Sequence, residues 1–209
     1  MHYTCERKTP TPKFRKANMR KKNILILLCV STLCLIAFFA GLNFGSPSKV
    51  SELKKTLPAN MITLNAINPP SADWTLLNKS PFDINSLQGK YVILNFWATW
   101  CPPCLVEFPE ILDFVDEHQE NFSVVFVSSD RDISAIEKFT SKLSPEHKKI
   151  MDSKNVIMLH DKKAKITRDI FQSFKLPESY ILNKQGQMEF KIIGPLTKST
   201  YQVLSTLDP

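Results

Sequence analysis

The order of the apolar segments predicts an α/β sandwich in which helices flank a mixed β-sheet. Two continuous apolar runs rich in β-forming residues, YVILNFWAT at 91–99 and FSVVFVSSD at 122–130, are typical of strands that are buried on both faces. Segments with a helical pattern alternate with these runs, and 178–194 forms a predicted hairpin around a Lys-Gln-Gly turn. Strands that alternate with helices and end in a hairpin indicate one mixed sheet.

The other predicted elements follow in order along the chain. Residues 72–90 have short apolar stretches interrupted by Ser-Pro, Asn-Ser and Gly, which predicts two strands joined by a turn. A third buried strand is predicted at 155–161. Ser144 and Pro145 are typical of a helix start, as the N-cap and a first-turn residue. We expect helices from the cysteines to about Gln119 and at 133–143, 144–154, 163–174 and 197–207.

The formal net charge of +7 belongs to the N-terminal part of the chain. Residues 1–45 contain eight Lys and Arg residues and one Glu, whereas residues 46–209 contain 19 basic and 19 acidic residues. A domain that binds nucleic acid normally presents an excess of basic residues to the phosphate backbone. Because residues 46–209 are neutral as a whole, we predict that the protein does not bind nucleic acid.

The basic residues precede an apolar segment that is long enough to cross a membrane. Residues 24–42 are 19 residues without a charge, and a helix of that length covers roughly 30 Å, the thickness of the bilayer hydrocarbon core. Six basic residues lie between positions 13 and 22, and no charge follows the segment until Lys49. The positive-inside rule therefore places the N-terminus in the cytoplasm and the rest of the chain outside it.

This topology predicts a single-pass protein with four parts. They are a basic cytoplasmic tail at 1–23, a transmembrane signal-anchor helix at 24–44, a linker at 45–60 and a globular domain at 61–209. A cleaved signal peptide is the alternative. Its apolar core is normally about 7–15 residues long and precedes a pair of small residues, for which FFAGLNFGS offers poor positions.

Two of the five cysteines, Cys101 and Cys104, lie in the predicted globular domain. In an oxidising compartment such a close pair is either joined in a disulfide or kept reduced by a partner. A structural zinc site needs four ligands, and His118, His147 and His160 are not spaced to complete one. A purely structural disulfide is the weakest interpretation, because so short a loop constrains the unfolded chain little. We predict a redox pair without a metal.

The place of this pair, directly after a predicted buried strand, suits redox chemistry. The attacking sulfur must be an exposed thiolate, and a helix N-terminus stabilises an anion through its partial positive charge and free N–H groups. We expect Cys101 to be this nucleophile and Cys104, one turn into the helix, to face inward and attack the mixed disulfide. Pro102 and Pro103 fall where a helix start has no N–H group to satisfy.

The segment GKYVILNFWATWCPPCLVEFP at 89–109 resembles the motif of membrane-anchored, thioredoxin-like thiol–disulfide oxidoreductases of bacteria, the TlpA/ResA/CcmG family. The similarity extends more loosely over about 70–205. It implies a thioredoxin-like sandwich with a redox-active Cys101–Cys104 disulfide. It also implies a place in the bacterial inner (cytoplasmic) membrane, with the C-terminal domain in the periplasm or, more generally, on the extracytoplasmic side.

The resemblance also indicates a substrate-binding surface. The cis-proline of the family, which faces the cysteines across the active site, corresponds to Pro177 in FKLPESYIL. An X–Pro bond adopts the cis form more readily than any other peptide bond. We expect Trp100, Leu176 and the cis Pro177 to contact the substrate, with Trp100 at the rim of the active site.

Glu107 is an acid on the predicted apolar face of the helix that follows the cysteines. At 100° per residue it lies between Ile111 and Phe114, one turn beyond Cys104. A poorly solvated carboxyl has a raised pKa, so Glu107 could exchange protons with Cys104 near neutral pH. The family has a glutamate at this place, and Asn95 stands where cytoplasmic thioredoxins have a buried aspartate. The alternative is a carboxylate that reaches solvent at the helix edge.

These features predict an enzyme that reduces disulfides in client proteins through its Cys-Pro-Pro-Cys dithiol. The resemblance implies electrons from a membrane thiol transporter. It also implies a client with a disulfide or CxxC motif, such as apocytochrome c or a copper-site assembly protein. Two alternatives remain: a thiol oxidant or isomerase of the same fold, and a non-enzymatic Cu(I)-binding assembly factor that also uses Met158 or His160. We expect no cofactor, and a soluble, monomeric domain when the anchor is removed.

Overall fold

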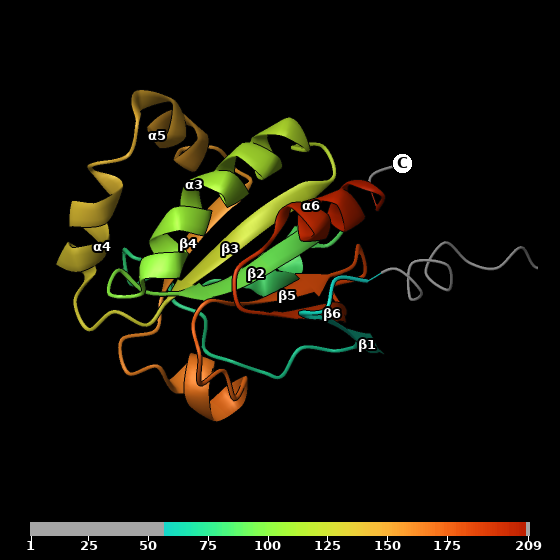
Figure 1. The fold of residues 1–209 in the computed structure, drawn as a ribbon. Coiled ribbons are helices and arrows are strands. Elements are labelled where there is room, and N and C mark those ends of the chain that lie inside the picture. The colour runs from blue at the N-terminus through green and yellow to red at the C-terminus, as the bar shows by residue number, and fades with distance from the viewer. Residues whose placement is uncertain (1–56, 208–209) are drawn as a thin grey trace, which may run out of the picture. The chain divides into compact units, whose positions relative to one another are not determined.

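A computed structural model describes residues 57–207 and contains one six-stranded mixed sheet in that range (Figure 1). The strand order is β1-β6-β5-β2-β3-β4. Strands β2, β3 and β4 are parallel, whereas β5 and β6 each run antiparallel to their neighbours. The strands are β1 (Met61–Ile67), β2 (Tyr91–Trp97), β3 (Phe122–Ser128), β4 (Val156–His160), β5 (Glu178–Leu182) and β6 (Met188–Ile193). The predicted mixed sheet is therefore confirmed.

Helices lie on both faces of this sheet. Figure 1 shows α3, α4, α5 and α6 on one face and the orange π-helix η2 on the other. The helical elements are η1 (Ile84–Leu87), α3 (Pro102–Glu117), α4 (Ile133–Thr140), α5 (Pro145–Met151), η2 (Lys165–Ile170) and α6 (Lys198–Ser205). Ser144 caps α5 by accepting a hydrogen bond from the N–H of His147, and Pro145 is in the first turn, as the sequence predicts.

Two apolar cores separate the sheet from its covering layers. Alternate residues of β2 enter different cores, because successive side chains of a strand point to opposite faces: Ile93 and Trp97 pack beneath α3, whereas Leu94 and Phe96 pack on the side of η2. Phe108 of α3 is stacked on Phe126 of β3, with ring centroids 4.1 Å apart. This contact fixes the first two turns of α3, which contain Cys104 and directly follow Cys101, against the sheet.

Two segments that precede β2 differ from the prediction. No strand is predicted at Met61–Ile67, but this segment is β1, paired antiparallel with β6. Its left-handed residues Asn65 and Ala66 interrupt the register and weaken the strand pattern. The predicted strand pair in 72–90 is wrong. That segment forms an isolated bridge between Thr75 and Pro81, followed by η1.

The predicted helix at 163–174 is shorter than expected. The structure has a π-helix over Lys165–Ile170 only, preceded by Ala164 and followed after Phe171 by Gln172, both with a positive φ. A residue in the left-handed conformation ends a right-handed helix, because its backbone dihedral angles cannot continue the helix. Single π-turns are often found at functional sites, and this one lies in the connection that leads to Pro177.

The predictions for the N-terminal part of the chain lie outside the described residues. They concern the tail at 1–23, the anchor at 24–44 and most of the linker at 45–60. Between residues 57 and 207, no helix has the length and apolar character needed to cross a bilayer.

Candidate active site

Cys101 lies at the junction between the central strand β2 and helix α3. Its N–H donates to the carbonyl of Ala98 at 3.1 Å, which closes the turn after β2. Its extended backbone makes it the N-cap residue of α3, with proline in the first turn of the helix. Cys104 follows within that turn, and the two sulfurs are joined in a disulfide, with the Cα atoms 5.3 Å apart. The structure thus shows the oxidised form of the pair.

A buried carboxylate holds the turn that precedes Cys101. Asp130, two residues beyond the end of β3, accepts from the N–H of Thr99 at 2.9 Å and from its hydroxyl at 2.7 Å. The hydroxyl of Ser128 donates to the same carboxylate at 2.8 Å. Asp130 therefore ties the C-terminal ends of β2 and β3 together, directly beneath the turn to the cysteines.

The two sulfurs differ in their access to solvent. Cys104 is 1% exposed, and Cys101 is 4% exposed, less than the exposed nucleophile predicted from the sequence. Cys101 nevertheless lines an open groove of about 230 Å³, whereas Cys104 does not. The side chains of Trp100 and Phe174, which are 60% and 75% exposed, line the same groove.

The residues expected to contact the substrate lie around the groove, with one exception. Trp100 and Leu176 line it together with Cys101. Pro177 is buried and does not line it, although the Leu176–Pro177 bond is cis. Strand β5 begins directly after Pro177 and pairs with β2, which brings this loop to the end of β2 from which the cysteines follow.

Glu107 is buried one turn beyond Cys104, at 2% exposure. Its carboxylate does not reach solvent at the helix edge. Instead, Oε1 accepts from Nδ2 of Asn95 on β2 at 2.9 Å, and Oε2 accepts from the backbone N–H of Leu196 at 2.9 Å. Residues three apart on a helix lie on the same face, so the carboxyl and the Cys104 thiol share the inward face of α3.

Burial raises the pKa of Glu107 to about 7. The hydrogen bonds from Leu196 and Asn95 oppose this shift, because they stabilise the carboxylate, and the negative charge of Glu110 adds to it. A carboxyl with this pKa is present in both protonation states near neutral pH, as a group that takes and returns protons must be.

The amide of Asn95 can serve either protonation state of Glu107. It is completely buried, and Nδ2 also donates to the hydroxyl of Ser179 at 2.9 Å, while Oδ1 has no hydrogen-bond partner within the described residues. Turning the amide by half a rotation would present Oδ1 to Glu107 and Ser179. Oδ1 could then accept a hydrogen bond from each hydroxyl group, which suits a protonated carboxyl.

The contact between Asn95 and Glu107 could not be predicted from the sequence. Their bond joins β2 to α3, and Leu196 reaches the site from the loop before α6, 89 residues beyond Glu107. Asn95 and Ser179 face each other in the β2–β5 register, a pairing that follows only from the strand order. No local pattern in the sequence signals these contacts.

Comparisons with known proteins agree with this geometry. The Redoxin family profile matches residues 49–204. Sporulation thiol-disulfide oxidoreductase A of Bacillus subtilis is 27% identical over 177 residues, which cover 83% of this chain and 91% of that protein. Thiol-disulfide oxidoreductase ResA of Bacillus cereus is 31% identical over 176 residues, which cover 84% of this chain and 87% of that protein.

A solved structure shares the fold. It is that of a thiol:disulfide interchange protein, DsbE, of Chlorobium tepidum, with a TM-score of 0.56 and 19% identity. The match covers 69% of this chain and 96% of the other. The described part of the chain therefore has the thioredoxin-like α/β fold, with a mixed sheet flanked by helices.

Proposed function

This chain belongs to the Redoxin family, and from that membership and the Cys101–Cys104 pair we propose that it reduces disulfides in client proteins outside the cytoplasm. Its relatives and its thioredoxin-like fold make it a thiol–disulfide oxidoreductase. The observation that supports the proposed site most strongly is the placement of the pair at the start of α3, where Cys101 lines the groove and Cys104 is buried and does not line it.

The proposed reaction consists of two exchanges. The Cys101 thiolate attacks one sulfur of the client disulfide, forms a mixed disulfide and releases the other client sulfur as a thiolate, which takes up a proton. Cys104 then loses its proton and attacks the sulfur of Cys101, which releases the second client thiol and leaves the Cys101–Cys104 disulfide. Two electrons have passed from the dithiol to the client, and a reduced partner must restore the dithiol.

Glu107 is proposed to accept the proton of Cys104 in the second exchange. Its carboxyl lies on the same face of α3 and has a pKa of about 7, so it is partly ionised at neutral pH. Asn95 cannot carry a proton itself, but it keeps a hydrogen bond to the carboxyl of Glu107 in both the ionised and the protonated state.

The second exchange gives the test of this function. In the full chain with Cys104→Ala, Cys101 can attack a client but nothing can resolve the product, so a mixed disulfide should accumulate in the native host. It should disappear on treatment with a thiol reductant, and mass spectrometry should identify the client. The matched Cys101→Ala/Cys104→Ala chain should capture nothing. Absence of any adduct from the single variant, together with tight Cu(I) binding by the reduced wild-type chain, would favour a copper-binding assembly factor instead.

We also propose that residues 24–44 anchor the chain in the bacterial inner membrane and hold the enzyme domain outside. The apolar run, the six preceding basic residues and the family resemblance support this topology. Protease added to spheroplasts should degrade the domain and leave a short N-terminal tag protected. Protection of the domain until the membrane is lysed would reverse the topology, and a free soluble domain would indicate a cleaved signal peptide.

The client and the electron source are proposed from the same resemblance. A membrane thiol transporter would supply electrons, and apocytochrome c or a copper-site assembly protein would receive them. Anchoring raises the local concentration of such membrane-bound partners. A reduction potential of the Cys101–Cys104 pair well below that of glutathione is expected for a reductant. A potential close to those of strong periplasmic oxidants would identify an oxidant.

A further inference from the structure

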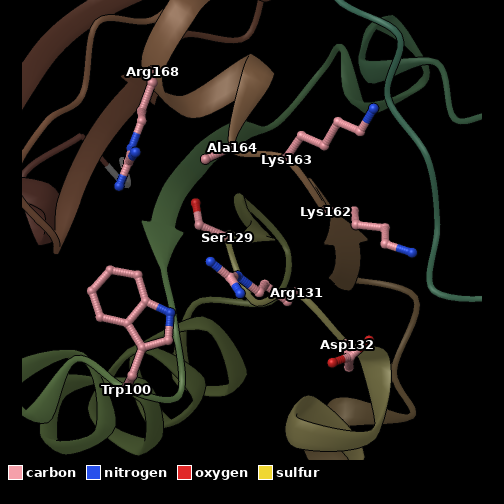
Figure 2. A pocket seen from close by; sticks show the side chains of 8 residues that line it. All are labelled: Trp100, Ser129, Arg131, Asp132, Lys162, Lys163, Ala164 and Arg168. Carbon is pink, nitrogen blue, oxygen red and sulfur yellow. The ribbon is translucent and has the colours of Figure 1, made fainter.

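A basic pocket lies beside the cysteines. It has a volume of about 720 Å³. Its charged lining consists of Arg131, Lys162, Lys163, Arg168 and Asp132. In Figure 2, the two arginines extend toward the side of the pocket on which Trp100 lies, and the two lysines lie on the other side. Four cations against one carboxylate make the pocket positively charged.

The charges of these cations are not neutralised within residues 57–207. The structure has no salt bridge to any of the four in that range, and all four side chains are exposed. The acids directly before Arg131 and Lys162 are hydrogen-bonded to other residues. Asp130 accepts from Thr99 and Ser128, and Asp161 accepts from the N–H and hydroxyl of Thr167. The basic groups therefore remain available to a partner from outside the domain.

The pocket is continuous with the groove at Cys101. Trp100, Ser129 and Arg168 line both of them. The groove has an apolar side, formed by Phe174 and Leu176 among others, whereas the pocket is basic. A polypeptide whose disulfide enters the groove would therefore place its neighbouring residues in or near the basic pocket.

We propose that this pocket binds an acidic segment of the client, so that the enzyme selects disulfides with Asp or Glu residues nearby in the chain. The inference rests on the proposed reductase function and names the chemistry of its client. Because the pocket and the groove share lining residues, one peptide can occupy both the basic pocket and the site of sulfur exchange. This arrangement favours a peptide over a membrane surface as the partner. Complementary charges act mainly by raising the rate of encounter and by excluding unsuitable partners.

Two synthetic peptides and one double substitution test this proposal. The peptides share one intramolecular CxxC disulfide and differ only in flanking residues, aspartate in one and asparagine in the other. At low salt the full-length reduced chain is expected to reduce the acidic peptide with a kcat/KM about tenfold higher. The preference should fade near 1 M salt, where the Debye length is about 3 Å.

The variant Lys162→Gln/Lys163→Gln should lower kcat/KM for the acidic peptide severalfold and leave the neutral peptide unaffected. Lys148→Gln/Lys149→Gln is the matched control, because it removes two adjacent exposed lysines from α5, which do not line the pocket. This control variant should still reduce the acidic peptide with a higher kcat/KM than the neutral peptide.

The possible failures are distinguishable. If the wild-type chain reduces both peptides at the same rate, the inference is wrong and the reductase function stands. If it reduces neither peptide, the reductase function itself is wrong. Equal peptide rates, combined with binding to phosphatidylglycerol vesicles that the Lys162→Gln/Lys163→Gln variant weakens, would assign the pocket to a membrane surface and overturn the proposal.

Discussion

Replacing Cys101 by serine is expected to lower the rate of disulfide reduction by about a thousandfold or more. Removing the nucleophile of a covalent mechanism normally has an effect of this size or greater, and the hydroxyl of serine does not form a bond with a disulfide sulfur. The buried Cys104 cannot take over, because it does not line the groove that the client would enter. The rate of insulin or CxxC-peptide reduction by the full chain measures the loss.

The matched control is Cys104→Ser, which leaves the nucleophile in place. This variant should still react once with a client and then stop at the mixed disulfide. Either substitution removes the disulfide of the oxidised form, whose closed loop of four residues contributes only about 2 kcal/mol to stability. Both variants should therefore remain folded by circular dichroism. Full activity of the Cys101→Ser chain with a folded domain would contradict the assigned roles.

Substituting Glu107 by glutamine should change the pH dependence of both catalysis and stability. In the wild-type chain, transfer of the Cys104 proton should follow a group with a pKa of about 7. Glutamine cannot accept that proton, and general base catalysis typically contributes at least about a hundredfold. We expect the second exchange to slow by roughly that factor and to lose its dependence on a group that titrates near neutrality. Stopped-flow measurements of mixed-disulfide decay across pH would show this.

The stability effect has a defined sign. The folded-state pKa of Glu107 is raised from 4.5 to about 7, so the native state holds a proton that the unfolded state has already lost. The free energy of unfolding should therefore fall as the pH rises from 4.5 to 7, by about 3 kcal/mol in total, and remain low above that range. Glutamine resembles the protonated form. The oxidised Glu107→Gln chain should be more stable than wild type at pH 8 and similar to it at pH 4.

Two further variants separate this effect from a general loss of acid. Glu117→Gln removes an exposed carboxylate from the end of the same helix. It should change neither the pH dependence of the second exchange nor that of the free energy of unfolding. Asn95→Asp/Glu107→Gln moves the carboxyl to the neighbouring side chain on β2, across their 2.9 Å hydrogen bond, and should restore part of the lost rate. Superimposable profiles for wild type and Glu107→Gln would mean that another group carries the proton.

The fold could be predicted where a local pattern decides the structure. Strands β2 and β3 are continuous apolar runs because both of their faces are buried, and α5 begins where Ser144 caps it. Strand β1 gave no such signal: it is an edge strand with two left-handed residues, and its partner β6 lies more than 100 residues away in the sequence. Its existence depends on a pairing that no local window contains.

The candidate site could be predicted only where it depends on a local sequence pattern. The order of strand, cysteine pair and helix is local, and so is the position of Glu107 on the inward face of α3. The hydrogen bonds from Asn95 and Leu196 depend on the packing of three separate segments. The basic pocket is the clearest case, because the charges of residues 46–209 sum to zero while the loops after β3 and β4, together with η2, bring four cations to one place.

The recessed position of Cys101 also bears on when a client can be reduced. Since Cys101 lines the groove together with Trp100 and Phe174, the proposed reaction requires the sulfur of a client to enter this groove. A disulfide within a folded protein is held by packed chain on both sides, whereas an extended segment can enter freely. The enzyme should therefore act on polypeptides that have not yet folded. The folding rate of each client, rather than the strength of its disulfide, then sets how long it remains a substrate.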